Sequence, residues 1–126
     1  MGIDIYARWN EQTESEKEAQ MSVWLSATAG DAGYLREAYH GEPYATQHLC
    51  AEAFLSPERE ARIPAAVLRD RLPETLTLIE ERERKIYGVT DRAEIDSVKQ
   101  SFRNFVALCE RKEKETGEPV VIVASF

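Results

Sequence analysis

The sequence predicts an α+β fold in which a small sheet pairs the N-terminal and C-terminal strands and helices pack on one face. The chain opens with a period-two alternation over residues 3–9, which is typical of a half-buried strand. It closes with an apolar, β-branched run over residues 120–126. The residues between carry helical periodicity, and this arrangement favours one sheet with helices on it. We expect a third strand near Tyr34.

The opening strand has an apolar face and a polar face. Its alternating positions are Ile3, Ile5, Ala7 and Trp9 against Asp4, Tyr6 and Arg8. The second set is therefore expected to face solvent or a site. The closing strand is apolar on both faces, which favours a central place in the sheet.

Capping patterns and periodicity predict the helices. Thr13 and Glu16 have capping-box spacing before a short polar helix over residues 14–20. Further helices are expected over residues 44–54, 64–72, 73–87 and from about 91 to 115. Pro73 either starts a helix or kinks a continuous one. Residues 21–28 fit a helix or a strand, and Ser56-Pro57-Glu58 has the pattern of a helix start.

Length and charge restrict the class of protein. A chain of 126 residues predicts a single domain over residues 1–126. The net charge of −7 argues against nucleic-acid binding, which depends on a basic face. Because the sequence has no long apolar run and no leader pattern, we expect no membrane partner and a cytoplasmic location. A homodimer is compatible with the sequence, although no heptad seam requires it.

The versatile side chains concentrate between Gly33 and Tyr44. In an extended conformation Tyr34, Arg36 and His40 share one face and Glu37 lies on the other, whereas a helix brings Arg36, Glu37 and His40 close together. We expect a turn at Gly41 and Pro43, followed by a short helix.

Two functions are consistent with this stretch. The first is a binding or interaction module that uses the Tyr34–Tyr44 region, with ligand-binding candidates Asp4, Tyr6, Tyr34, Arg36 and Tyr44. The second is a small enzyme acting on an anionic molecule, in which His40 is the general base, Glu37 orients it and Arg36 holds the anion. No nucleophile motif accompanies these residues, so we prefer the first.

Metal and cofactor binding are not predicted. His40 and His48 with a carboxylate such as Asp4, Glu42 or Glu52 have the ligand types for zinc or iron, but their spacing matches no known pattern. We therefore assign no metal site and no cofactor. Cys50 and Cys109 lie in apolar surroundings without a CxxC spacing, and we expect free, partly buried thiols, with a disulfide as the alternative that depends on their geometry.

Several short motifs resemble those of a group of small uncharacterised bacterial and phage proteins. The chain opens Met-Gly-Ile-Asp-Ile-Tyr, carries Gly33-Tyr34-Leu35-Arg36 and ends in Ser125-Phe126. Members of that group open Met-Gly-Leu-Asp-Met-Tyr, carry Gly-Tyr-Trp-Arg followed by a His, and end in Ser-Ser-Trp. The resemblance implies no activity. It implies that Asp4, Tyr6, Arg36 and His40 belong together.

Overall fold

The computed structural model describes residues 2–39 and 41–126. Ten elements follow one another along the chain: β1 (Gly2–Arg8), α1 (Glu14–Ser22), the 3-10 helix η1 (Gly30–Ala32), β2 (Tyr34–Ala38), α2 (Ala45–Leu49), α3 (Ala51–Leu55), β3 (Glu60–Arg62), α4 (Ala65–Lys85), α5 (Arg92–Thr116) and β4 (Val121–Ser125).

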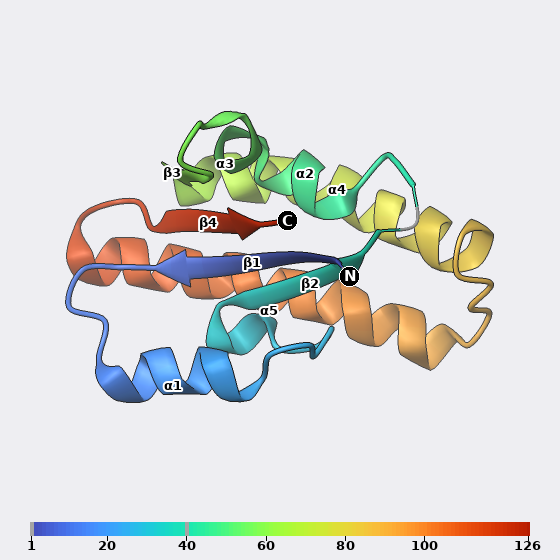
Figure 1. Cartoon of the computed structure of the whole chain (residues 1–126), viewed down its shortest axis with the longest axis horizontal. Helices are drawn as coiled ribbons and strands as arrows, with labels where there is room; N and C mark the ends of the chain where they lie inside the picture. Colours follow the sequence, from blue (N-terminus) through green and yellow to red (C-terminus); the bar gives the residue numbers. More distant parts are fainter. Residues whose placement is uncertain (1, 40) are drawn as a thin grey trace.

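The four strands form one antiparallel sheet in the order β2-β1-β4-β3 (Figure 1). The predicted pairing of the two terminal strands is confirmed, because Asp4 lies opposite Ser125 and Arg8 lies opposite Val121. The third strand near Tyr34 is also confirmed, as β2. The apolar β4 lies inside the sheet, as its composition predicts.

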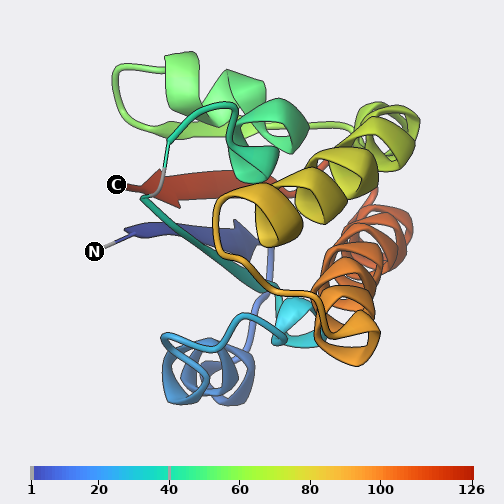
Figure 2. The same ribbon diagram turned by 90° about the vertical axis from the view of Figure 1, so that its right-hand side faces the viewer.

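The helices give the sheet an inner and an outer face. In Figure 2, α4 and α5 lie to the right of the sheet, on what we call its inner face, and α1 lies below it. Ile3, Ile5 and Ala7 are each at most 2% exposed and point to the inner face, where the core forms. The predicted α+β class, with helices packed against the sheet, is confirmed.

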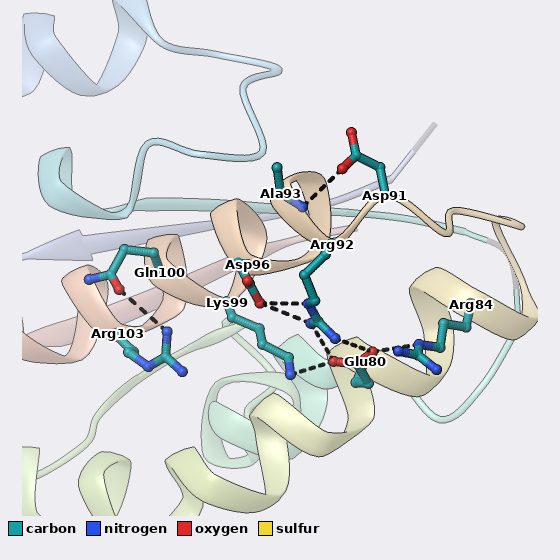
Figure 3. Close-up of polar contacts among 9 residues, drawn as sticks. All are labelled: Glu80, Arg84, Asp91, Arg92, Ala93, Asp96, Lys99, Gln100 and Arg103. Carbon is teal, nitrogen blue, oxygen red and sulfur yellow. Dashed lines mark hydrogen bonds and ion pairs between the residues drawn. The ribbon is translucent and has the colours of Figure 1, made fainter.

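The long helices α4 and α5 are joined by a group of charged side chains (Figure 3). Glu80 of α4 accepts from Arg92 at 2.6 and 3.0 Å and from Lys99 at 2.6 Å, both on α5. Arg84, one turn along α4, pairs with the same carboxylate at 2.6 Å. These cations lower the pKa of Glu80 to about 2. These ion pairs connect the last turns of α4 to the first turns of α5.

The small helix η1 packs tightly on α5 because it begins with glycine. Gly30 N donates to Ser101 Oγ at 2.9 Å. A Cβ atom at Gly30 would lie 1.7 Å from the backbone oxygen of Ser101, so only glycine permits this approach. Next to it, Gln20 of α1 donates to Ala7 O at 2.8 Å and thus connects α1 to β1.

One predicted helix start is wrong. Residues 56–59 form a turn, in which Arg59 N donates to Ser56 O at 3.0 Å and Arg59 adopts a left-handed φ of 57°. Arg59 O then accepts from Ala124 N at 2.8 Å, which places the chain beside β4 as β3. The reason is that β4 has an edge to be paired, and this tertiary pairing overrides the local helix-start pattern.

Other boundaries differ from the predictions. The helix expected over residues 44–54 is interrupted at Cys50, where ψ is 38°, so that α2 and α3 are separate. Residues 23–28 contain turns and no strand. Pro73 lies inside one continuous helix, α4. The capping box of Thr13 and Glu16 is present as predicted.

Within the described residues, no helix combines the length and apolar character that a membrane span needs. Cys50 and Cys109 are free, and both are fully buried and not partly buried as expected. Burial raises the pKa of both thiols, which keeps them protonated at neutral pH.

Candidate functional site

Asp4 joins β1 to β2 on the outer face of the sheet. Its Oδ1 accepts hydrogen bonds from Tyr34 OH and from Arg36 Nη1, the latter at 2.7 Å. The strand register places Asp4 opposite Arg36 and Tyr6 opposite Tyr34, and the two tyrosine rings are 5.2 Å apart. Four of the five predicted ligand-binding residues thus lie side by side.

Tyr34 is fully buried although it belongs to the outer face. The segment after α1 covers it, and Leu25 N donates to the Tyr34 hydroxyl at 3.1 Å. Burial, followed by the bond to Asp4, raises the pKa of Tyr34 to about 12. The same carboxylate raises the pKa of Arg36. At neutral pH the Asp4, Tyr34 and Arg36 side chains therefore satisfy one another.

Glu37 lies on the inner face, opposite to its neighbour Arg36. Its carboxylate accepts from Ala45 N and Thr46 N, each at 2.9 Å, and from Thr46 Oγ1 at 2.6 Å. Glu37 therefore caps the first turn of α2 from a separate strand. Arg82 completes its surroundings, with Nε at 2.8 Å from Oε2.

The structure thus separates Arg36 and Glu37, which the enzyme hypothesis places in one site. Side chains of successive strand residues point to opposite faces, and β2 follows this rule. Arg36 pairs with Asp4, and Glu37 pairs with Arg82. His40, the predicted general base, lies outside the described residues.

Arg82 is the one buried arginine among the described residues. It links α4 to β2 and to the loop before α2. It is 3% exposed, and its Nη1 donates to Gly41 O and to Pro43 O, the latter at 2.8 Å. Its guanidinium also lies 4.8 Å from the centre of the Tyr44 ring. Tyr44, the fifth predicted ligand-binding residue, is thus placed with Arg82 and not with Asp4.

Sequence reasoning did not identify Arg82, although a signal was present. Arg82 follows Ile79 by three positions and precedes Ile86 by four, so it occupies the apolar stripe of α4. A charged residue at such a position indicates a buried partner, because an unpaired buried charge is costly.

The outer edge of β2 has open backbone groups. Ala7 N donates to Gly33 O at 2.9 Å. This bond determines which residues of β2 form hydrogen bonds with β1. Because antiparallel pairs alternate, Leu35 bonds to β1, and Arg36 directs its N–H and C=O away from the sheet. In the part of the chain that the structure describes, no hydrogen bond engages these two groups of Arg36.

The two ends of this edge are occupied. At one end Tyr34 N donates to Ala29 O at 3.4 Å. At the other, Ala38 O accepts from Arg82 Nη2 at 3.4 Å and from Tyr87 OH at 3.2 Å. The open stretch is therefore short and centred on Arg36.

A cavity of about 350 Å³ lies along this open stretch, between β2 and the helices α4 and α5. Residues 36–38 form one wall. The apolar lining consists of Leu25, Ala27, Ile79, Val89, Val98 and Phe102. The polar lining includes Arg82, Glu83 and Tyr87. An apolar cavity with a few polar groups is the usual form of a binding site.

Exposed apolar side chains lie at the end of α1 and in the turn after it, and one of them lines the cavity. Met21, Trp24 and Leu25 are 65%, 55% and 53% exposed, and Leu25 also lines the cavity. Leu25 has a left-handed φ of 76°, which is uncommon for a residue with a branched side chain. Three large apolar side chains held at the surface within five positions are typical of a contact surface.

The hypothetical metal ligands that the structure describes do not form a cluster, and His40 lies outside the described residues. His48 Nε2 lies 3.5 Å from Glu74 Oε2 on α4. Glu52 is bound by both terminal nitrogens of Arg71, at 2.6 and 2.7 Å. No group of three or more His, Cys, Asp or Glu residues with metal-binding geometry occurs within residues 2–39 and 41–126.

Comparison of the chain with protein-family models, with curated proteins and with solved structures finds no match. The resemblance to small bacterial and phage proteins stays a prediction.

Proposed function

We propose that this chain is an interaction module that binds an extended peptide segment along the free edge of β2. The observation that carries the proposal is the unbonded N–H and C=O of Arg36 beside an apolar cavity. A strand added to a sheet edge gains main-chain hydrogen bonds, and pockets for alternate side chains provide specificity. The edge of β2 and the cavity supply these two components.

The added strand would place its side chains alternately on the two faces. One set would lie above Tyr34 and Arg36 on the outer face. The other would enter the cavity between β2 and the helices and contact Ile79 and Phe102. Leu25, which lines the cavity and is 53% exposed, would cover the apolar part of the bound segment.

A peptide suits this edge better than a second copy of the chain. The open stretch of β2 is short, because Tyr34 N at one end and Ala38 O at the other are already engaged. A short open edge beside a cavity suits a single extended chain that inserts side chains into the cavity, whereas a second globular copy would pair along the backbone alone. A homodimer is therefore the alternative outcome of the test below.

An enzyme acting on an anion has less support. Arg36, the predicted anion-holding residue, already pairs with Asp4 at 2.7 Å, and Glu37 is bound to Arg82 and to the start of α2. An anion would have to displace Asp4 from Arg36. Binding a peptide backbone leaves both pairs intact.

The proposal includes a cytoplasmic location. The two free, buried thiols support it, since cytosolic proteins keep cysteines reduced. We also propose that the chain is related to the small bacterial and phage proteins whose motifs it resembles.

The experiment is an NMR titration of the ¹⁵N-labelled protein with a short blocked peptide of alternating valine and threonine. We expect the Arg36 amide to shift and its hydrogen exchange to slow, because it gains a hydrogen-bond acceptor. Ala38→Pro removes the other outward N–H of this edge and should weaken binding, whereas Ala38→Val retains that donor and should not.

A peptide with N-methylated alternate residues is the second control and should not bind. Unchanged Arg36 exchange at millimolar peptide would refute the proposal. Shifts at Arg36 that appear on concentrating the protein alone would instead indicate a homodimer.

A further inference from the structure

Two carboxylates line the cavity beside β2, and one of them has no ion-pair partner among the described residues. Three other acidic or basic residues contribute to its lining, and each of them is paired: Arg36 with Asp4, and Glu37 with Arg82. Glu83, on the last turns of α4, is in no ion pair among the residues that the structure describes. It is half-buried at the cavity wall.

The surroundings of Glu83 are unfavourable to its negative charge. Burial raises its pKa, and the nearby carboxylate of Glu94 raises it further. Arg82 acts in the opposite direction, but its charge is shared with Glu37. A cation that enters the cavity would offset the unfavourable burial of the Glu83 charge. The attraction between the cation and the Glu83 carboxylate would then stabilise the bound state.

The other walls suit the stem of a long basic side chain. Ile79, Val98 and Phe102 are apolar, and methylene groups of lysine or arginine pack well on such surfaces while the charged end reaches a polar group. The volume of about 350 Å³ accommodates one side chain of this size. The net charge of −7 also favours encounter with a basic partner.

We infer that the peptide segment bound along β2 carries a lysine or arginine, that its basic side chain enters the cavity, and that Glu83 is the counter-ion. This inference rests on the proposed function. It defines the partner as a basic, extended segment and gives Glu83 a role in specificity.

The test compares two blocked peptides that differ in one position. Both alternate valine and threonine, and the central residue is lysine in one and norleucine, its uncharged analogue, in the other. Dissociation constants come from the NMR shift of the Arg36 amide. For the unmodified protein we expect the lysine peptide to bind about fivefold more tightly.

Two variants separate the local from the overall charge effect. Glu83→Gln should reduce the preference for lysine to about one. Glu81→Gln removes the same charge from an exposed position of α4, and this variant should keep the preference for lysine. Thermal unfolding of both variants checks that they fold.

The outcomes distinguish this inference from the proposed function. If both peptides shift Arg36 but Glu83→Gln keeps the lysine preference, or if norleucine binds more tightly, the edge proposal stands and the inference is wrong. If neither peptide affects Arg36, the proposed function fails and the inference fails with it.

Discussion

Glu37 Oε2 lies 2.8 Å from Arg82 Nε, and the two side chains are only 8% and 3% exposed. This ion pair connects the edge strand β2 with the C-terminal part of α4, where Arg82 lies. Glu37 also caps α2. The pair therefore holds together three elements around the open edge.

Removal of Arg82 should strongly destabilise the protein. Arg82→Ala leaves Glu37 buried without its counter-charge, which costs about 3–5 kcal/mol in free energy of unfolding. Urea denaturation measures it. Arg84→Ala, two positions along α4 at an exposed site, is the control and should leave the midpoint nearly unchanged. The double variant Glu37→Gln/Arg82→Met should be more stable than Arg82→Ala alone. Equal losses in both would contradict a charge effect.

Alkaline pH should destabilise the fold through Tyr34. An unfolded tyrosine loses its proton near pH 10, whereas Tyr34 in the folded protein does so near pH 12. Since the folded state holds the proton more tightly, this stabilisation is complete below pH 10 and is lost as the pH rises from 10 to 12. Tyr34→Phe should flatten the stability curve in that range. Ultraviolet absorbance of tyrosinate and thermal unfolding at several pH values measure both effects. A Tyr34→Phe curve as steep as that of the unmodified protein would refute this assignment.

At pH 7, the Glu83→Gln variant should be at least as stable as the unmodified protein. The raised pKa of Glu83 means that the folded state favours its protonated form, so the contribution is favourable at acidic pH and is lost as the pH rises. The neutral amide avoids this loss. Thermal unfolding at pH 4 and pH 7 provides the comparison, and the advantage of the variant should be larger at pH 7. A clear drop in stability at pH 7 would indicate a partner for Glu83 within the fold.

Gly30→Ala should separate η1 from α5. The new Cβ would lie 1.7 Å from Ser101 O, so the backbone must move, at a cost of about 1–3 kcal/mol. Asp31→Ala, at the next and exposed position, is the matched control and should change little. Chemical denaturation measures both variants. If Gly30→Ala is as stable as its control, the close packing of η1 on α5 is incorrect.

The elements with a clear period could be predicted from the sequence. The alternation of Ile3, Ile5 and Ala7 predicts β1, and the long apolar stripe after Asp91 predicts α5. The three-residue strand β3 could not be predicted, because it is too short to show a period and forms only when β4 is beside it. The break at Cys50 likewise has no local signal.

The candidate site was predicted in part. The N-terminal strand lies next to the strand that begins at Tyr34. This pairing brings Asp4, Tyr6 and Arg36 together, as expected. The open edge could not be predicted, because strand order is a tertiary property. The role of Glu83 depends on the cavity wall formed by two helices, which periodicity does not describe.

The two fixed ends of the β2 edge have a consequence for affinity. Ala29 holds the strand at Tyr34, and Arg82 with Tyr87 holds it at Ala38, so the backbone at Arg36 is already ordered before a ligand arrives. Binding then requires conformational entropy to be lost mainly by the peptide. Ligands that are themselves preorganised, such as cyclic hairpins that present one extended strand, should therefore gain the most in affinity.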